Sequence, residues 1–323
     1  MKRKICIAGK NNIAVNCLQY ALNFFEKKEV CVILNKSDDF VDGWQKSLGL
    51  FAIKNDIDIV DIEDVYNIDN LIFLSLEYDK IINPCIFKTC RLFNIHFSYL
   101  PEYKGVYTSI LPILHGKSYS GVTLHCIDQG IDTGDIIDQV KFAISEMTSF
   151  DLYKRYLEEG EKIFVKNFQN LVRNNFLKKN QSCDYSTYYS RNTLDVKDVN
   201  IKFNQTAFQI KNFVNAFNFR PYQLPFFYNY KINRLIISNN RSIKKFGEVI
   251  FECDEFYKVS TLDYDVFLFK DYFDDLKTFC KSKDICSLRK IIKFTLKDHS
   301  TDKNGLSCID YIKKYELFDA ISC

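Results

Sequence analysis

The chain of 323 residues is long enough to form two or three domains around one large core. Its 44 basic and 41 acidic side chains give a net charge of +3, a balance that does not mark a nucleic-acid binder. With 47% hydrophobic and 26% charged residues, the composition is that of a globular protein and argues against extensive disorder.

The twelve cysteines are scattered through the chain, several of them inside apolar runs, and no two have the Cys-x-x-Cys spacing of zinc or redox sites. We therefore expect reduced, buried thiols in a cytoplasmic protein, and no metal site. The first residues become polar too early for the core of a signal peptide. No run approaches the roughly 18 apolar residues of a membrane span, so we expect no membrane contact.

The first half of the chain alternates between short apolar runs and segments with helical spacing. The predicted strands are residues 4–8, 29–34, 57–60, 71–76, 93–97, 122–127 and 136–140, the last two as a hairpin-type pair. The predicted helices are residues 13–25, 44–55 and 149–176. This order predicts an α/β fold with a mostly parallel sheet covered on both faces, whose ligands bind beyond the carboxyl ends of the strands.

A polar linker at residues 174–184 separates this first domain, residues 1–180, from a second one, residues 185–270. The second domain is predicted to be small and mainly β. Its predicted elements are a helix at 206–217 and strands at 226–232, 234–237, 248–253, 257–261 and 266–270.

The last segment, residues 271–323, is predicted to be helical, with a helix pair at 271–280 and 285–294. The run Asp302-Lys-Asn-Gly-Leu-Ser-Cys-Ile and the helix after it resemble an ankyrin repeat. Cys308, Asp310 and Ile312 stand where that repeat usually carries Pro, His and Ala. The alternative is a generic helical tail.

Two polar motifs between residues 93 and 140 carry the candidate chemistry. Asn94 and His96 are two residues apart on a predicted strand, so their side chains project from the same face. Asp132 follows in a glycine-flanked turn that could bring a carboxylate beside them. Such a set supplies a neutral donor, a proton acceptor near pH 7 and an anion that orients the imidazole.

The motifs Asn-x-His-x-Ser-x-Leu-Pro (residues 94–101) and Asp-x-Gly-x-Asp-Thr-Gly-Asp (residues 128–135) resemble those of the folate-dependent formyltransferases. This resemblance implies a Rossmann-like catalytic domain, N10-formyltetrahydrofolate as co-substrate and Asn94, His96 and Asp132 as catalytic residues. It also implies that the folate carrier is bound, largely through backbone groups, at Ser75, Ile82, Asp128, Gly130 and Asp132.

Four further segments, residues 9–14, 43–47, 75–82 and 219–223, resemble the branch of this family that acts on dTDP-linked amino sugars. They imply an acceptor site at Gly9, Asn11, Trp44, Gln45, Lys46 and Tyr222. Asn11 would meet the pyrophosphate near a helix N-terminus, and Tyr222 would stack on the base beside a fixed proline. The implied reaction is formyl transfer to the 3- or 4-amine of a dTDP-amino-dideoxyhexose, for O-antigen or another surface polysaccharide, by a homodimer.

Two alternatives stay open at this point. One is a methionyl-tRNA or other small-amine formyltransferase, although Lys104 replaces a usual Arg and an extended basic C-terminal region for RNA is missing. The other is a non-enzymatic, ankyrin-type adaptor with a degenerate enzyme domain, which the intact motif residues argue against. His115, His125 and His299 match no catalytic position and are predicted to be structural.

Overall fold

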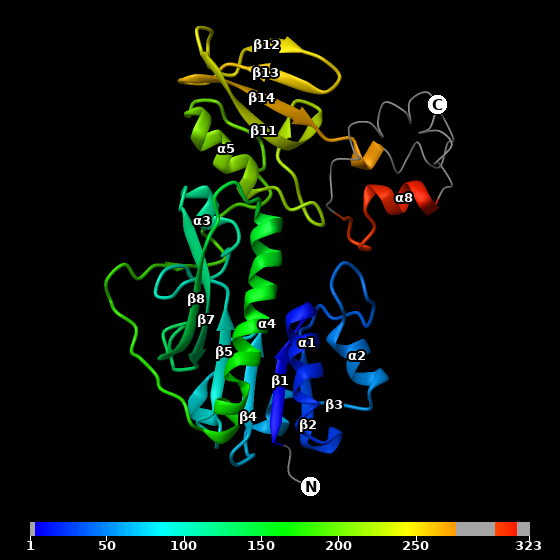
Figure 1. The fold of residues 1–323 in the computed structure, drawn as a ribbon, viewed down its shortest axis with the longest axis vertical. Coiled ribbons are helices and arrows are strands. Elements are labelled where there is room, and N and C mark those ends of the chain that lie inside the picture. Colours follow the sequence, from blue (N-terminus) through cyan, green and yellow to red (C-terminus); the bar gives the residue numbers. More distant parts are fainter. Residues whose placement is uncertain (1–3, 276–300, 315–323) are drawn as a thin grey trace. The chain divides into compact units, whose positions relative to one another are not determined.

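The computed structural model describes residues 4–275 and 301–314. The chain divides into two compact units (Figure 1). The first unit comprises Met1–Pro112, Ser118–Ser145 and Leu152–Leu194, and the second comprises Ile113–Lys117, Glu146–Asp151 and Asp195–Cys323.

The first unit is built on a seven-stranded sheet with the order β3-β2-β1-β4-β5-β7-β8. Its strands are β1 (Ile5–Gly9), β2 (Val30–Leu34), β3 (Asp58–Ile59), β4 (Ile72–Leu76), β5 (Leu92–His96), β7 (Tyr119–Cys126) and β8 (Ile136–Ala143). The strands from β3 to β5 pair in parallel, whereas β7 pairs antiparallel to both β5 and β8. The sheet is therefore mixed, and the predicted hairpin-type pair is β7 and β8.

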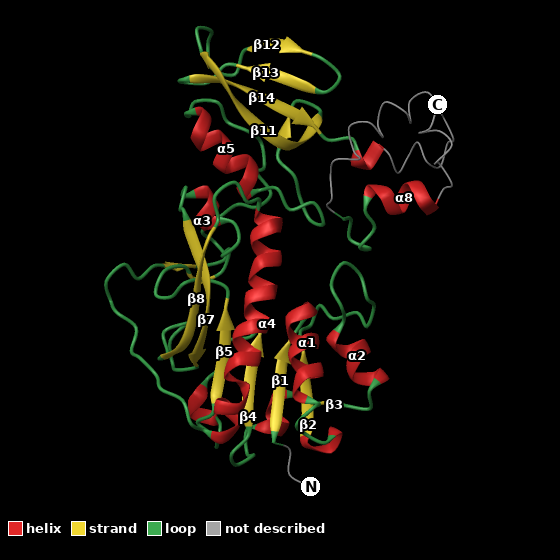
Figure 2. Ribbon diagram, viewed as in Figure 1, coloured by secondary structure: helices red, strands yellow, loops and turns green. Residues whose placement is uncertain are grey.

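The helices of this unit follow the predicted pattern, with shifted ends (Figure 2). They are α1 (Asn11–Ala21), α2 (Leu48–Lys54) and α4 (Ser149–Arg173), with α3 (Leu111–Leu114) and the 3-10 turns η1 (Lys27–Glu29), η2 (Ile62–Val65) and η3 (Pro84–Ile86). The prediction that a helix begins at Trp44 is wrong. The Ser47 hydroxyl caps α2 by accepting the Leu50 N–H, so residues 44–46 lie in the preceding loop.

The carboxyl ends of β1 and β4 come unusually close together at Gly9. A Cβ atom at Gly9 would lie 1.9 Å from the Leu76 carbonyl oxygen, which only a glycine avoids. The residues after each strand, Lys10 and Glu77, therefore leave the sheet side by side. A two-stranded parallel pair, β6 (Lys104–Gly105) with β9 (Tyr188–Tyr189), keeps the chain in this unit up to Leu194, beyond the predicted limit at residue 180.

The second unit contains the predicted small β domain. A five-stranded antiparallel sheet has the order β10-β11-β14-β13-β12. Its elements are α5 (Ala207–Ala216), β10 (Phe226–Phe227), β11 (Tyr230–Arg241), β12 (Val249–Glu252), β13 (Phe256–Val259) and β14 (Tyr264–Lys270). The two strands predicted at 226–232 and 234–237 are instead a short strand, a turn and one long strand. The apolar face of α5 packs on the sheet through Ile210 and Val214.

In the described part of the predicted ankyrin-like segment, residues 273–275 are helical, and a turn at Asp302 leads into α8 (Cys308–Lys314). The Asp302 carboxylate accepts the N–H groups of Asn304 and Leu306, and Ser307 caps α8. The predicted helix at 285–294, His299 and the end of the predicted helix at 271–280 lie outside the described residues. The ankyrin-like module therefore stays a prediction.

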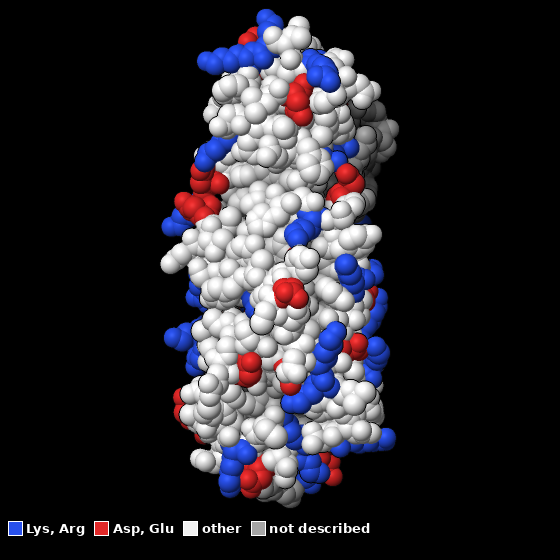
Figure 3. Space-filling model, turned by 90° about the vertical axis from the view of Figure 1, so that its left-hand side faces the viewer, with Lys and Arg blue, Asp and Glu red and all other residues white. Residues whose placement is uncertain are grey.

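Two observations concern the helices and the charge distribution of the described residues. None of the described helices is both long and apolar enough to cross a bilayer. On the face drawn in Figure 3, basic and acidic side chains of the described residues are interspersed.

Candidate active site

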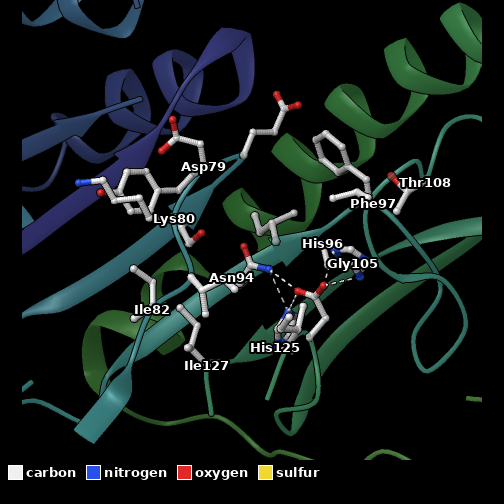
Figure 4. A pocket seen from close by; sticks show the side chains of 18 of the residues that line it. Asp79, Lys80, Ile82, Asn94, His96, Phe97, Gly105, Thr108, His125 and Ile127 are labelled. Carbon is white, nitrogen blue, oxygen red and sulfur yellow. Dashed lines mark hydrogen bonds and ion pairs between the residues drawn. The ribbon is translucent and has the colours of Figure 1, made fainter. Parts of the chain in front are cut away.

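A cavity of about 1010 Å³ opens at the carboxyl ends of β4 and β5, entirely within the first unit. Its walls also include the turn at residues 128–132 and the segment at residues 188–191. Its volume is at the upper end of the usual range for sites that hold small ligands. The side chains of Asn94, His96 and His125 converge at one side of it (Figure 4).

Strand pairing puts Asn94 and His96 into this cavity. Asn94 lies opposite Ser75 on the parallel strand β4 and opposite His125 on the antiparallel strand β7. Two residues further along β5, His96 points to the same face, as the two-residue period of a strand predicts. Both side chains and His125 line the cavity.

Asp132 reaches the two strand residues from the turn that follows β7. Its backbone adopts a φ of +54°, which is uncommon for a residue with a side chain. Gly134 lets this turn fold closely on β7, because a Cβ atom there would lie 1.9 Å from the Cys126 carbonyl oxygen. The Asp132 Oδ1 atom accepts from Asn94 Nδ2 at 3.2 Å, and Oδ2 accepts from the Gly105 N–H at 2.9 Å.

The Asp132 carboxylate stays ionised at neutral pH. Its side chain is only 12% exposed, and this burial by itself would raise the pKa. The nearby imidazoles of His96 and His125 and the Gly105 N–H outweigh burial and lower the pKa well below the usual range of an aspartate. The predicted anion is thus held in its charged form beside both histidines.

The hydrogen bonds of His96 define which nitrogen can take up a proton. Its Nε2 atom lies 2.8 Å from the carbonyl oxygen of Tyr103, which can only accept, so Nε2 carries a hydrogen. Its Nδ1 atom lies 3.5 Å from Asp132 Oδ2. Nδ1 is therefore the atom that gains the proton, and the carboxylate stabilises the imidazolium that results.

His125, which the sequence analysis assigned to a structural role, also belongs to this cluster. Its side chain is 3% exposed, and its Nε2 atom lies 3.1 Å from Asn94 Nδ2 and 3.6 Å from Asp132 Oδ1. Its Nδ1 atom donates to the Cys126 carbonyl at 2.8 Å, so Nε2 is the accepting nitrogen. The signal that could have found it is cross-strand pairing with Asn94, which a sequence without known strand register does not reveal.

The orientation of the Asn94 amide follows from its neighbours. A carboxylate can only accept, so the Asn94 atom beside Asp132 is the nitrogen. That nitrogen has two hydrogens, which meet Asp132 and His125. Both donor hydrogens of the Asn94 amide are therefore already engaged within the cluster.

The residues predicted to bind the folate carrier lie around the same cavity. Ser75, Ile82, Asp128, Gly130 and Asp132 are all among its lining residues. The Asp128 Oδ1 atom accepts from the Gly130 N–H at 3.1 Å and from the Thr133 hydroxyl at 2.6 Å, so it stabilises its own turn. Within the described residues, no group of three His, Cys, Asp or Glu side chains could hold a metal ion.

The residues predicted to bind the acceptor divide into two groups. In the first unit, the Gln45 side chain accepts the N–H of Asn12 and the Asn12 side chain accepts the N–H of Lys46, which ties the loop to the start of α1. The Trp44 ring lies 5.7 Å from that of Tyr153 on α4. Gly9 and Asn11 flank the cavity residue Lys10. Tyr222 belongs to the second unit and is 65% exposed.

Comparison with known proteins identifies the family. The model of the formyl transferase family matches residues 58–168. The structure of WlaRD, a sugar 3-N-formyltransferase solved in the presence of dTDP and 5-N-formyl-THF, is 47% identical over 84% of this chain and 98% of its own, with a TM-score of 0.78. An N-formyltransferase from Helicobacter canadensis, solved in complex with folinic acid and dTDP-3-aminofucose, is 45% identical over 83% of this chain and 99% of its own, also with a TM-score of 0.78.

A more distant relative is the methionyl-tRNA formyltransferase of Clostridioides difficile, 25% identical over 80% of this chain and 89% of its own. The sugar enzymes match at higher identity over nearly their whole length. This chain therefore belongs to the formyl transferase family and, within it, to the sugar N-formyltransferases.

Proposed function

We propose that this enzyme transfers the formyl group of N10-formyltetrahydrofolate to the 3-amine of a dTDP-linked amino-dideoxyhexose. The observation that carries the proposal is the cluster of Asn94, His96 and ionised Asp132 in one cavity, in a chain similar over most of its length to enzymes solved with dTDP and a formyl folate. Position 3 is favoured over position 4 because both of these relatives are described with a 3-amino or 3-N sugar.

His96 moves the proton in this reaction. The sugar amine attacks the formyl carbon, and its nitrogen becomes positively charged as the new C–N bond forms. His96 Nδ1 accepts a proton from that nitrogen and returns it to N10 of the folate as the bond from N10 to the formyl carbon breaks. Asp132 lies 3.5 Å from Nδ1 and stabilises the imidazolium between these two steps.

Asn94 stabilises the negative charge that develops on the formyl oxygen. Both of its N–H hydrogens already have acceptors, so the oxyanion must replace one of them. The neutral His125 nitrogen is a weaker acceptor than the Asp132 carboxylate and is the one displaced. A donor of this kind contributes about 10²–10³ in rate.

A panel of acceptors tests the proposal. The purified enzyme is incubated with N10-formyltetrahydrofolate and, separately, with a dTDP-3-amino sugar, a dTDP-4-amino sugar and methionyl-tRNA, and the formylated products are measured by mass spectrometry. We expect turnover with the 3-amino sugar. Turnover with the 4-amino sugar alone would correct the position of the amine, and turnover with methionyl-tRNA alone would overturn the proposal.

Four narrower predictions complete this proposal. The product enters O-antigen or another surface polysaccharide, the enzyme works in the cytoplasm as a homodimer, and residues 271–323 form an ankyrin-like module. Support for the module comes from the Asp302 turn and the Ser307-capped helix α8. A molecular mass measured in solution tests the dimer, since a monomer of 38.0 kDa would contradict it.

A further inference from the structure

Glu77 is a half-buried carboxylate in the wall of the same cavity, and none of the steps above uses it. It directly follows β4 and has a φ of +58°, so the chain turns sharply where the strand ends. On β4, Ser75 lies opposite Asn94 of β5. Two residues further along each chain come Glu77 and His96, which places Glu77 at the same end of the sheet as the catalytic cluster.

Two side chains hold the Glu77 carboxylate through one of its oxygens, and a third holds its backbone. The Oε2 atom accepts from Tyr153 Oη at 2.7 Å and from Asn11 Nδ2 at 3.1 Å. The Asn35 side chain donates to the Glu77 carbonyl at 2.9 Å. The Oε1 atom makes no hydrogen bond to any residue that the structure describes. A carboxylate fixed in this way presents one oxygen that can accept from a ligand.

The other carboxylates in the cavity wall are engaged differently. Asp132 uses both oxygens within the catalytic cluster. Asp128 stabilises its own turn, and Asp79 is exposed and accepts the Lys36 N–H. Glu77 alone among these lining carboxylates combines partial burial with an oxygen that has no partner among the described residues.

The chemistry of the acceptor calls for such a group. The sugar amine lies next to ring carbons that carry electron-withdrawing oxygen atoms. It therefore resembles the α-amino group of a peptide, with a pKa of about 7.7–8.0, and is mostly protonated at neutral pH. An ammonium nitrogen has no lone pair and cannot attack the formyl carbon. It must lose one proton before attack and a second proton after it.

We infer, on the basis of the proposed function, that Glu77 binds the ammonium group of the acceptor sugar and takes its first proton. The proton moves from the sugar nitrogen to Glu77 Oε1 and from there to solvent, which leaves the nitrogen lone pair free. The second proton leaves the same nitrogen after the C–N bond forms and passes through His96 to N10. Two protons therefore leave the nitrogen, one reaches N10 and one is released.

The surroundings of Glu77 suit this role. Its burial raises its pKa, while the hydrogen bond from Tyr153, the charge of Lys10 and the hydrogen bond from Asn11 oppose that shift without cancelling it. Lys10 is the charged group facing Glu77, and Tyr153 is the titratable hydroxyl. A carboxylate with a raised pKa is a better proton acceptor than one exposed to water.

The pH dependence of kcat/KM for Glu77→Gln tests the inference. At pH 7 we expect kcat/KM to fall about ten-fold, because an amine with a pKa of about 7.7–8.0 is only about one-tenth free base at that pH. The difference in kcat/KM between Glu77→Gln and the wild type should become smaller as the pH rises above the pKa of the amine, because the amine then reaches the site already deprotonated. A deficit that is the same at every pH, or no deficit at pH 7, would overturn the inference.

Binding measurements separate this inference from the proposed function. Wild type and Glu77→Gln should bind dTDP equally, and Glu77→Gln should bind the dTDP-amino sugar more weakly. Both proteins should bind equally an analogue that carries a hydroxyl in place of the amine. Failure of the wild type to bind the amino sugar would contradict the proposed function, whereas equal binding of the amino sugar by both proteins would contradict only the role of Glu77.

Glu161 provides a matched control. It is a partly buried glutamate on α4 whose Oε2 atom accepts from an asparagine, Asn16, at 2.8 Å, as Glu77 does from Asn11. It is not part of the cavity wall as the structure describes it. Glu161→Gln should keep the wild-type pH profile. A profile like that of Glu77→Gln would show that the change in pH dependence is not specific to Glu77.

Discussion

In the first unit, Asp132 and Glu77 line a cavity, whereas in the second unit Arg220 and Asp271 form a buried ion pair. Arg220 Nη2 lies 2.6 Å from Asp271 Oδ1, and the two side chains are 6% and 1% exposed. The Arg220 guanidinium also lies over the Phe273 ring, 4.4 Å from its centre. Arg220 and Asp271 satisfy each other's charge inside the second unit. In the first unit, the Glu77 carboxylate is held through Oε2, and its Oε1 atom makes no hydrogen bond to any described residue.

Lys270 repeats the arrangement of the second unit. Its Nζ atom contacts Glu252 Oε1 at 2.7 Å and the Cys253 carbonyl at 2.8 Å, and it lies 4.1 Å from the centre of the Tyr257 ring. Buried charge is costly unless it is paired or used. The comparison teaches that a buried charge paired with another residue points to a role in stability. A carboxylate in a cavity wall that has an oxygen without a hydrogen-bond partner among the described residues points to a role in chemistry.

The largest effect should come from breaking the pair in the second unit. Arg220→Ala leaves the Asp271 carboxylate buried without its cation, and we expect a loss of about 3–5 kcal/mol in the free energy of unfolding. Denaturant titration measures this loss. Arg234→Ala is the control, because Arg234 is exposed and lies over the Phe269 ring at 4.0 Å. Its removal should cost at most about 1 kcal/mol. Equal losses in both variants would contradict the distinction.

In the first unit, substitution should affect rate before stability. Asn94→Ala removes the donor for the oxyanion, and we expect kcat to fall by about 10²–10³. Affinity for dTDP should stay close to that of the wild type, since Asn94 acts on the formyl group. Steady-state kinetics and calorimetry measure the two quantities. An unchanged kcat would remove Asn94 from the mechanism.

His125 sharpens the same comparison, because it is buried and yet belongs to the cavity. His125→Ala leaves the Asn94 amide without its second acceptor, so the amide is free to rotate. An Asn94 amide that rotates freely points its N–H at the oxyanion for only part of the time, and we expect kcat to fall by roughly two- to ten-fold. The exposed His115 of the second unit serves as control, and His115→Ala should keep the wild-type kcat. A wild-type kcat in His125→Ala would leave His125 with the structural role first predicted.

The smallest effect should come from Tyr222, if this exposed ring stacks on the base of the acceptor. Tyr222→Ala should raise KM for the dTDP sugar by a few-fold, in line with about 0.5–1.5 kcal/mol for an aromatic pair, and leave kcat nearly unchanged. Tyr228, which is 67% exposed in the same unit, is the matched control. An equal rise in KM for Tyr228→Ala would indicate a general surface effect instead of stacking.

Local patterns in the sequence predicted most of the architecture. Four of the five parallel strands are short, buried apolar runs, which made them visible, whereas β3 consists of two exposed residues. The prediction that the Asn94 and His96 side chains lie on the same face of one strand required only the two-residue period of a strand. The position of Ser47 as a helix cap was missed because the apolar spacing continues back to Trp44, and a Ser hydroxyl reveals its role only through the backbone it contacts.

Contacts between distant segments could not be predicted in this way. His125 joins the site through its register with β5, and Glu77 through Asn11 and Tyr153, which are 66 and 76 residues away. The turn between β10 and β11 was missed because aromatic residues surround Asn229, the one residue of this turn that is typical of turns. Strand register and side-chain networks depend on the whole fold, and periodicity in one segment does not contain them.

The central claim, that His96 transfers the proton during formyl transfer to a dTDP-amino sugar, is tested most directly by a single-turnover experiment. Wild type and His96→Ala are each mixed with saturating N10-formyltetrahydrofolate and dTDP-3-amino sugar, and the formylated sugar is followed with time. We predict a rate about 10²–10⁴ lower for His96→Ala, with unchanged affinity for dTDP. Formylation by His96→Ala at the wild-type rate would contradict the claim.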